Sequence, residues 1–132
     1  MLDNNDVQEA LINYLQGNAT VLTLSSNFPT EIREENWQGE KFSYPNIRVG
    51  CEITPASECG PDECFARIIA NSEEKSSKQA QTIAGTIAEE LHEKTFTQNS
   101  IRFSAIRVQR ISRAEQENSI WQSTVNVLMD VK

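Results

Sequence analysis

The sequence predicts an α+β fold in which an antiparallel sheet of four to five strands carries two helices packed on one face. One long segment has apolar residues at spacings of three and four, several others alternate apolar and polar residues, and the loops between them are short. The predicted order of elements is α-β-β-β-α-β-β. A length of 132 residues suits one hydrophobic core, so we expect residues 1–132 to form a single domain.

The first helix is predicted from Asp3 to Gln16, with Gly17 as the stop after it. Its apolar stripe consists of Val7, Ala10, Leu11, Tyr14 and Leu15. The residues that can cap its start are Asn4, Asn5 and Asp6. The apolar run from Ala19 to Leu24 is long enough for one further helical turn.

Three strands are predicted next. Thr30 to Asn36 is a short strand with Ile32 pointing inward, and its acidic flanks are typical of a sheet edge. Asn46 to Thr54 alternates apolar and polar residues, which indicates a strand with one buried face. Cys64 to Asn71 is its predicted partner. The alternation there is imperfect, so we expect a bulge or an end effect.

The second helix is predicted over the long segment from Ser72 to Phe96. Its apolar stripe consists of Ala80, Ile83, Ala84, Ile87, Ala88 and Leu91. Half of these residues are alanine, so the helix can lie close against the sheet. Ser72 can cap the start, and Ser76 with Gln79 offers a second capping box.

A long hairpin closes the predicted fold. Its strands are Ser100 to Arg113 and Ile120 to Val131, joined by a turn from Ala114 to Ser119. The inward parity of the first strand changes between Phe103 and Ile106, which is the mark of a β-bulge.

The charge balance excludes some classes of function. Nineteen acidic residues against twelve Lys and Arg give a net charge of −7. A general nucleic-acid binder needs a basic face, and an anionic lipid surface attracts basic proteins, so neither is expected as a partner. The longest apolar runs are a few residues, and we expect neither a membrane span nor a signal peptide.

Catalytic groups are scarce in this sequence. His92 is the single histidine, and its position beside Glu89 and Glu93 is typical of a partly exposed helix face. No neighbouring pattern supports a catalytic triad, and the glycines form no phosphate-binding loop. We therefore expect no catalytic residue and no cofactor.

The three cysteines, Cys51, Cys59 and Cys64, lack the CxxC spacing of structural zinc sites. We expect no metal site, but free thiols in a reducing cytosol, with Cys51 buried on its strand. A disulfide between Cys59 and Cys64 across a short loop remains an alternative.

Two surface features are candidates for contacts with other proteins. The loop from Trp37 to Tyr44 contains three aromatic residues, Trp37, Phe42 and Tyr44. They either fold back onto the domain's own core or anchor a contact with another subunit, where aromatic residues are enriched.

The strand from Ser100 to Arg113 has no acidic residue and four arginines: Arg102, Arg107, Arg110 and Arg113. They either pair with glutamates of neighbouring strands or dock the basic strand against an acidic neighbour in a closed ring.

The whole pattern resembles the tail terminator (tail-completion) proteins of long-tailed bacteriophages. The similar stretches are VQEALINYL, PNIRV after the aromatic loop, IIANSEEKSSKQAQTIAGTIAEEL, and the closing IRFSAIRV and WQSTVNVLMDV. They are patterns of apolar positions that span nearly the full chain. The loop from Cys59 to Cys64 has no counterpart that we associate with the family.

The resemblance implies a structural virion protein without enzymatic activity. Such proteins form a ring, typically a hexamer, at the head-proximal end of the tail tube, where they stop tube polymerisation and join the tail to the head connector. The implied partners are further copies of the chain, the tail tube protein and the head connector or completion protein. The implied location is the neck region of the virion tail, after synthesis in the host cytoplasm.

Genome DNA would pass through the lumen of such a ring without specific binding. The acidity of the chain fits this role, because acidic residues on the wall would repel DNA. The family has no catalytic motif to transfer. Alternatives are another head–tail joining or minor tail protein, or a small cytoplasmic cysteine-containing binding or redox module.

Overall fold

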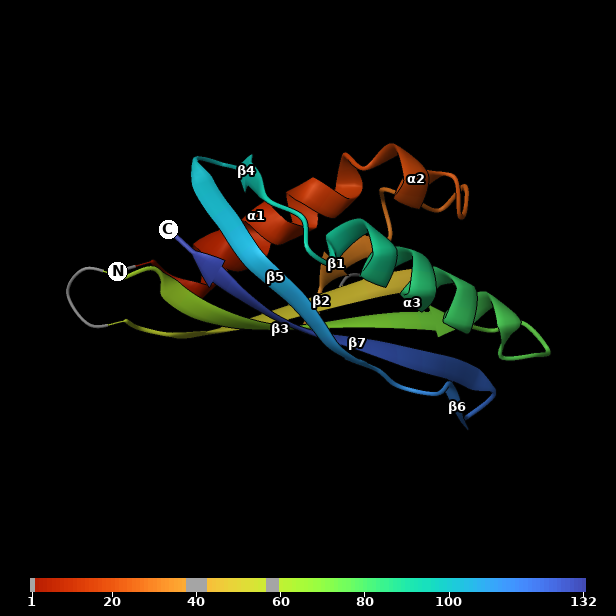
Figure 1. The fold of residues 1–132 in the computed structure, drawn as a ribbon. Helices are drawn as coiled ribbons and strands as arrows, with labels where there is room; N and C mark the ends of the chain where they lie inside the picture. The colour runs from red at the N-terminus through yellow and green to blue at the C-terminus, as the bar shows by residue number, and fades with distance from the viewer. Residues whose placement is uncertain (1, 38–42, 57–59) are drawn as a thin grey trace.

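The computed structural model describes residues 2–37, 43–56 and 60–132. These residues form three helices and seven strands in a mixed α+β arrangement (Figure 1). The helices are α1 (Asn4–Gln16), α2 (Ala19–Leu22) and α3 (Lys78–Leu91). The strands are β1 (Ile32–Glu34), β2 (Asn46–Thr54), β3 (Asp62–Ser72), β4 (Phe96–Gln98), β5 (Ile101–Ile111), β6 (Glu115–Glu117) and β7 (Ile120–Val131).

All seven strands belong to one sheet, in the order β1-β2-β3-β7-β5-β4, with β6 also paired to β7. Its centre is the antiparallel pair β3–β7, which runs in register from Asp62 opposite Val131 to Ser72 opposite Trp121. The prediction of a purely antiparallel sheet of four to five strands is wrong in two respects. The sheet contains the additional short strands β4 and β6, and β1 pairs with β2 in parallel, with Ile32 opposite Ile47.

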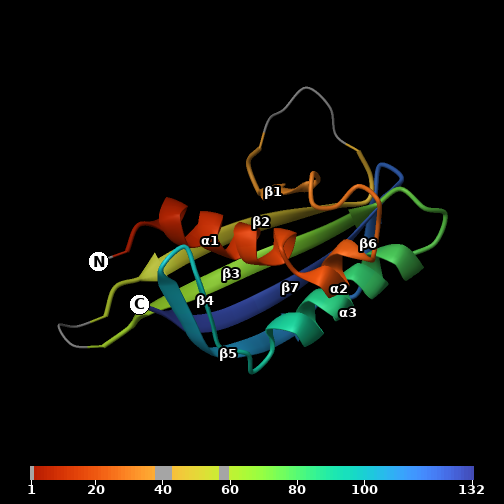
Figure 2. The ribbon, with the colours of Figure 1, turned by 90° about the horizontal axis from the view of Figure 1, so that it is seen from above.

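The helices cover one face of the sheet, as predicted, and leave the other uncovered. Figure 2 shows α1 above the β2 side of the sheet and α3 above the β5 side, with α2 between them. On β3 and β7, alternate side chains point under the helices and are fully or almost fully buried: Cys64, Ala66, Ile68, Ala70, Ser123, Val125, Val127, Met129 and Val131. The covered face therefore holds the core, and no helix covers the other face.

The helix boundaries differ from the predictions at both starts, and α3 also ends earlier than predicted, at Leu91, because Phe96 begins β4. Asp3 is the cap of α1, and its carboxylate accepts from the Asn5 N–H at 2.6 Å. The predicted stop at Gly17 is confirmed. Helix α3 begins at Lys78, because Ser72 is the last residue of β3 and its hydroxyl donates to Gln79 Oε1 at 2.6 Å. Neither Ser72 nor the predicted box of Ser76 and Gln79 caps α3.

Two tight turns explain the strands that the sequence analysis missed. Asn99 and Ser100 both have positive φ, at 53° and 63°, and join β4 to β5. Asn118 and Ser119 join β6 to β7 and also have positive φ, at 50° and 67°. A two-residue turn with positive φ at both positions matches the twist of paired strands.

The predicted bulge of the arginine strand is confirmed. The pairing of β5 with β7 shifts between Ser104 and Arg107, and Ala105 has a φ of 49°. The bulge places Phe103 and Ile106 on the same buried face.

Candidate subunit interface

The four arginines of the basic strand are exposed, three of them on β5 and Arg113 just after its end. The ion pairs within the described residues lie elsewhere, at Glu31–Arg48, Glu35–Arg67 and His92–Glu93. The prediction that Arg102, Arg107, Arg110 and Arg113 pair with glutamates of neighbouring strands is therefore wrong for the part of the chain that the structure describes. Their charge is directed to solvent.

On the uncovered face, an apolar spot lies between charges of opposite sign. Phe65 on β3 is 37% exposed and lies opposite Leu128 on β7. Glu52 on β2 flanks Phe65, and Arg107 on β5 flanks Leu128. This row crosses four strands and presents an acidic end, an apolar middle and a basic end.

The sheet edge opposite β5 carries acidic and apolar side chains. A groove of about 320 Å³ lies between α1 and β1, lined by Asn5, Gln8, Glu9, Ile12, Gln16, Ile32, Arg33, Glu34 and Trp37. Glu9 and Glu34 are its two acids, and both are exposed. We name this feature the α1–β1 groove.

Trp37 lies in this groove and is partly buried. The Arg33 guanidinium stacks over its ring, with the Arg33 Cζ 3.9 Å from the ring centroid, and Arg48 Cζ lies 5.6 Å from the same centroid. Contacts of this kind stabilise the ring position by about 0.5–2 kcal/mol. Trp37 therefore packs against its own domain and still contributes to a surface groove.

The other aromatic candidates fall in different places. Tyr44 is partly buried and lines a hollow at the end of the sheet with Asn46, Arg48 and Asn71. Phe42 lies outside the described residues. Trp37 and Tyr44 thus belong to the β1–β2 side of the sheet and the four arginines to the β5 side, so the predicted interface residues form two separate surfaces.

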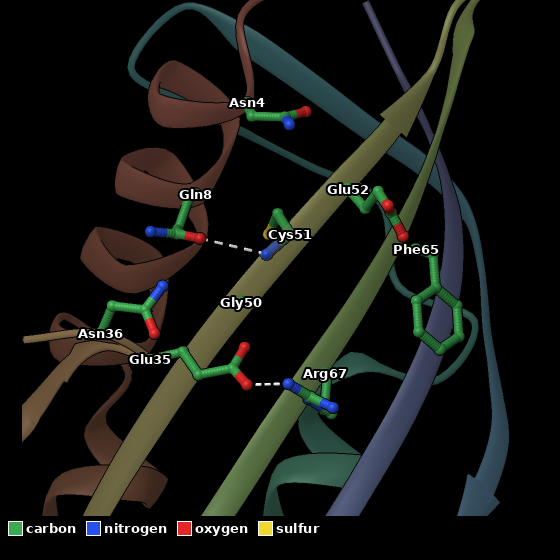
Figure 3. A pocket seen from close by; sticks show the side chains of 9 residues that line it. All are labelled: Asn4, Gln8, Glu35, Asn36, Gly50, Cys51, Glu52, Phe65 and Arg67. Carbon is green, nitrogen blue, oxygen red and sulfur yellow. Dashed lines mark hydrogen bonds and ion pairs between the residues drawn. The ribbon is translucent and has the colours of Figure 1, made fainter.

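A side-chain bridge crosses the uncovered face near the groove. Glu35 reaches over Gly50 on β2 to pair with Arg67 on β3 (Figure 3). A Cβ atom at position 50 would lie 3.2 Å from Glu35 Cδ, so the absence of a side chain at Gly50 allows this crossing.

Side chains of the helical layer occupy a few backbone donors at each edge of the sheet. Gln8 Oε1 accepts from the Cys51 N–H at 3.1 Å (Figure 3), and Asn4 Oδ1 accepts from the Ile53 N–H at 3.0 Å. On the other edge, His92 Nδ1 accepts from the Val108 N–H at 3.1 Å. These bonds occupy backbone donors that would otherwise recruit a foreign strand.

The two described cysteines lie on the neighbouring strands β2 and β3. Cys64 is buried and Cys51 is partly buried, and both are free thiols. A hydrogen bond with Cys64, together with burial, raises the pKa of the Cys51 thiol. The thiol therefore stays protonated at neutral pH, and the protonated form is a poor nucleophile. Cys59 lies outside the described residues, and Cys64 belongs to β3, so it is not available as an interface residue.

The single histidine makes a structural contact. His92 ends α3 and uses Nδ1 to hold β5, as described above. Among the described residues, no three metal-binding side chains cluster in a way that could hold a metal ion. In the described part of the chain, no helix has the length and apolar character needed to cross a membrane.

Sequence comparison gives no match to a protein-family model and none to a curated protein. Structural comparison does give matches. The fold is similar to that of a chain from the virion of a native gene transfer agent (GTA) particle, with a TM-score of 0.74 at 13% sequence identity. The similarity covers 95% of this chain and 93% of that chain.

The two chains share one fold. A second solved structure, whose name states no function, has a TM-score of 0.64 at 12% identity over 100% of this chain and 97% of that one. Because the overlap with the gene transfer agent protein is nearly complete in both directions, the shared unit is the whole domain.

Proposed function

We propose that this chain is a structural, non-enzymatic virion protein that forms a ring at the head-proximal end of a phage tail tube. In that role it ends tube polymerisation and joins the tail to the head connector. The observation that carries the proposal is the similarity in fold to a protein of the gene transfer agent virion, over nearly the full length of both chains.

The surface chemistry supports assembly rather than catalysis. Four exposed arginines on or just after β5 have no ion-pair partner among the described residues, and the opposite side of the sheet carries a groove with two exposed acids. Unsatisfied charges at defined positions steer association and fix the orientation of partners. The buried Cys64 and the partly buried Cys51 offer no comparable basis for a redox role.

The overall acidity fits the passage of DNA. A ring in which each copy carries a net charge of −7 has a strongly negative surface, and acids on its inner wall would repel the DNA backbone. DNA would then move through without specific binding. A structure of the assembled ring tests this point, and neutral or basic wall residues would contradict it.

The experiment that tests the proposed function combines native mass, negative-stain imaging and tube capping. Purified chain should form closed rings of about six copies, a number implied by the family resemblance, and should bind one end of tail tubes and stop their growth. Tubes that grow to the same length distribution with and without the chain would overturn the terminator role.

The Trp37→Ala variant separates assembly from folding. Trp37 lies in the α1–β1 groove, so we expect its loss to weaken ring formation more than it lowers the melting temperature of the monomer. The second candidate is another head–tail joining protein, which the same uncovered face and charged edges also suit. That protein would bind tube ends or connectors without stopping polymerisation.

A further inference from the structure

The two long edges of the sheet carry opposite charge. Strand β5 presents Arg107 and Arg110, both exposed, and the groove between α1 and β1 presents Glu9 and Glu34. Figure 2 shows β1 and β5 along opposite sides of the molecule, separated by β2, β3 and β7. Neither charged set can therefore satisfy the other within one copy.

We propose that the α1–β1 groove of one copy binds the β5 edge of a second copy, with Arg107 and Arg110 directed at Glu9 and Glu34. The inference rests on the proposed ring and names the surfaces that would close it. The occupant is a second copy of this chain because its own β5 edge has the complementary charge and no internal partner among the described residues.

The positions of the two surfaces determine the symmetry. A two-fold contact places the same patch of each copy against itself, and here that would bring arginine to arginine or glutamate to glutamate. A head-to-tail contact brings unlike edges together and leaves one groove and one β5 edge free at the ends of any open chain. Such a contact closes into a ring when the rotation per copy divides a full turn.

The groove is suited to hold a protein edge as well as to attract it. Its apolar lining comes from Ile12, Ile32 and Trp37, which a partner can bury. The Arg33 Nε atom is buried without a hydrogen-bond partner, although its guanidinium stacks on Trp37. The two acids outnumber Arg33, so the groove still favours a basic partner.

A paired charge reversal tests the contact. The variant R107E/R110E gives the β5 edge the sign of the groove, and E9R/E34R gives the groove the sign of the β5 edge. We expect each variant alone to require roughly ten- to a hundredfold higher concentration to assemble, because like charges then meet at the contact. A 1:1 mixture should assemble again, with the two variants alternating, and only in rings with an even number of copies.

The controls match the change in net charge. K75E/K78E equals R107E/R110E in charge, and E73R/E74R equals E9R/E34R, with all four control residues exposed near the start of α3, outside both the β5 strand and the α1–β1 groove. These controls should assemble as the unmodified chain does. Circular dichroism and thermal melting of every variant report whether it is folded.

The outcomes distinguish this contact from the proposed function. Rings that form unchanged with R107E/R110E, or variants whose mixture shows no more association than either alone, would overturn the contact and leave the ring role intact. An unmodified chain that remains monomeric, together with no association in the mixture, would also overturn the contact. The tube-capping experiment then decides the proposed function separately.

Discussion

Arg48 and Glu31 form an ion pair whose side chains are only 7% and 9% exposed. The Arg48 Nη2 atom lies 3.1 Å from Glu31 Oε1, and Nη1 donates to the Glu31 carbonyl at 2.8 Å. Arg48 is on β2 and Glu31 immediately precedes β1, so the pair fixes the parallel edge strand to the sheet. It thereby sets the position of the α1–β1 groove, since β1 is one wall of that groove.

Removing Arg48 should destabilise the fold strongly. The Arg48→Ala variant leaves the Glu31 carboxylate buried without its cation, which costs about 3–5 kcal/mol of unfolding free energy. Urea unfolding monitored by circular dichroism measures this loss. The matched control is Arg110→Ala on the exposed β5 edge, where we expect a change of about 0.5 kcal/mol or less. Equal losses in the two variants would show that the Glu31–Arg48 pair does not hold the edge strand.

The sequence predicts the elements whose local pattern agrees with their tertiary setting. The strands at Asn46–Thr54 and Ile120–Val131 have the predicted boundaries, because alternate residues of each are buried under the helices; at the start of β2 the residues of the other face, Asn46 and Arg48, are buried as well. Helix α3 starts six residues later than predicted, since pairing with β7 extends β3 through Ser72. Long-range strand pairing therefore overrides the local capping signals at the predicted start of this helix.

The candidate site likewise has one part that the sequence predicts and one part that it does not. The arginine strand is visible in sequence because four arginines occur in one stretch without an acid. The α1–β1 groove is not visible in the sequence, because Glu9 and Glu34 are far apart along the chain. Only the packing of α1 against the parallel strand β1 places both of them in one groove. The parallel pairing itself carries no local signal in a strand of three residues.

Loss of the Gln8 amide should expose the edge of β2. Gln8 Oε1 is the acceptor for the Cys51 N–H, and a net hydrogen bond of about 1 kcal/mol corresponds to roughly fivefold protection of that amide. The Gln8→Ala variant should therefore show faster hydrogen exchange at Cys51, measured residue by residue by NMR. The control is Asn13→Ala on the same helix. An unchanged exchange rate at Cys51 would mean that other groups protect this edge.

The stack of Tyr14, Phe96 and Phe103 should contribute measurably to stability. The rings of Tyr14 and Phe96 are parallel within 8°, and their centroids lie 3.6 Å apart. The ring centroids of Phe96 and Phe103 lie 4.8 Å apart. This stack connects α1 to β4 and β5, elements far apart in sequence. We expect Phe96→Ala to lower the unfolding free energy by about 2–3 kcal/mol, from lost burial and lost ring contact.

The exposed neighbour Thr97 provides the control for this change. Thr97→Ala retains the strand and removes no ring, so its unfolding free energy should fall by about 1 kcal/mol at most. Phe96→Leu should lie between the two variants, because it keeps apolar contact and loses the aromatic stacking. If Phe96→Ala and Thr97→Ala unfold at the same urea concentration, the stack does not stabilise the β4 edge.

Asp62 should make stability depend on pH in the acid range. Its carboxylate accepts from the Ala56 N–H at 3.0 Å and from the Leu2 N–H at 3.3 Å. These backbone hydrogen bonds, that of Ala56 first, lower the pKa of Asp62. A carboxyl whose pKa is lower in the folded state than in the unfolded chain stabilises the fold above its unfolded pKa of about 3.9.

This contribution should disappear as pH falls through the folded pKa of Asp62. The unfolding free energy of the unmodified chain should therefore fall more steeply below about pH 4 than that of Asp62→Asn, whose side chain does not titrate. Urea unfolding at a series of pH values measures the difference, and NMR titration of the Asp62 carboxyl gives its pKa directly. Glu63→Gln, next to it on β3, controls for removing one negative charge. A titration midpoint of Asp62 at or above about 3.9 would contradict the role of the two backbone donors, because hydrogen bonds to the ionised form can only lower that midpoint.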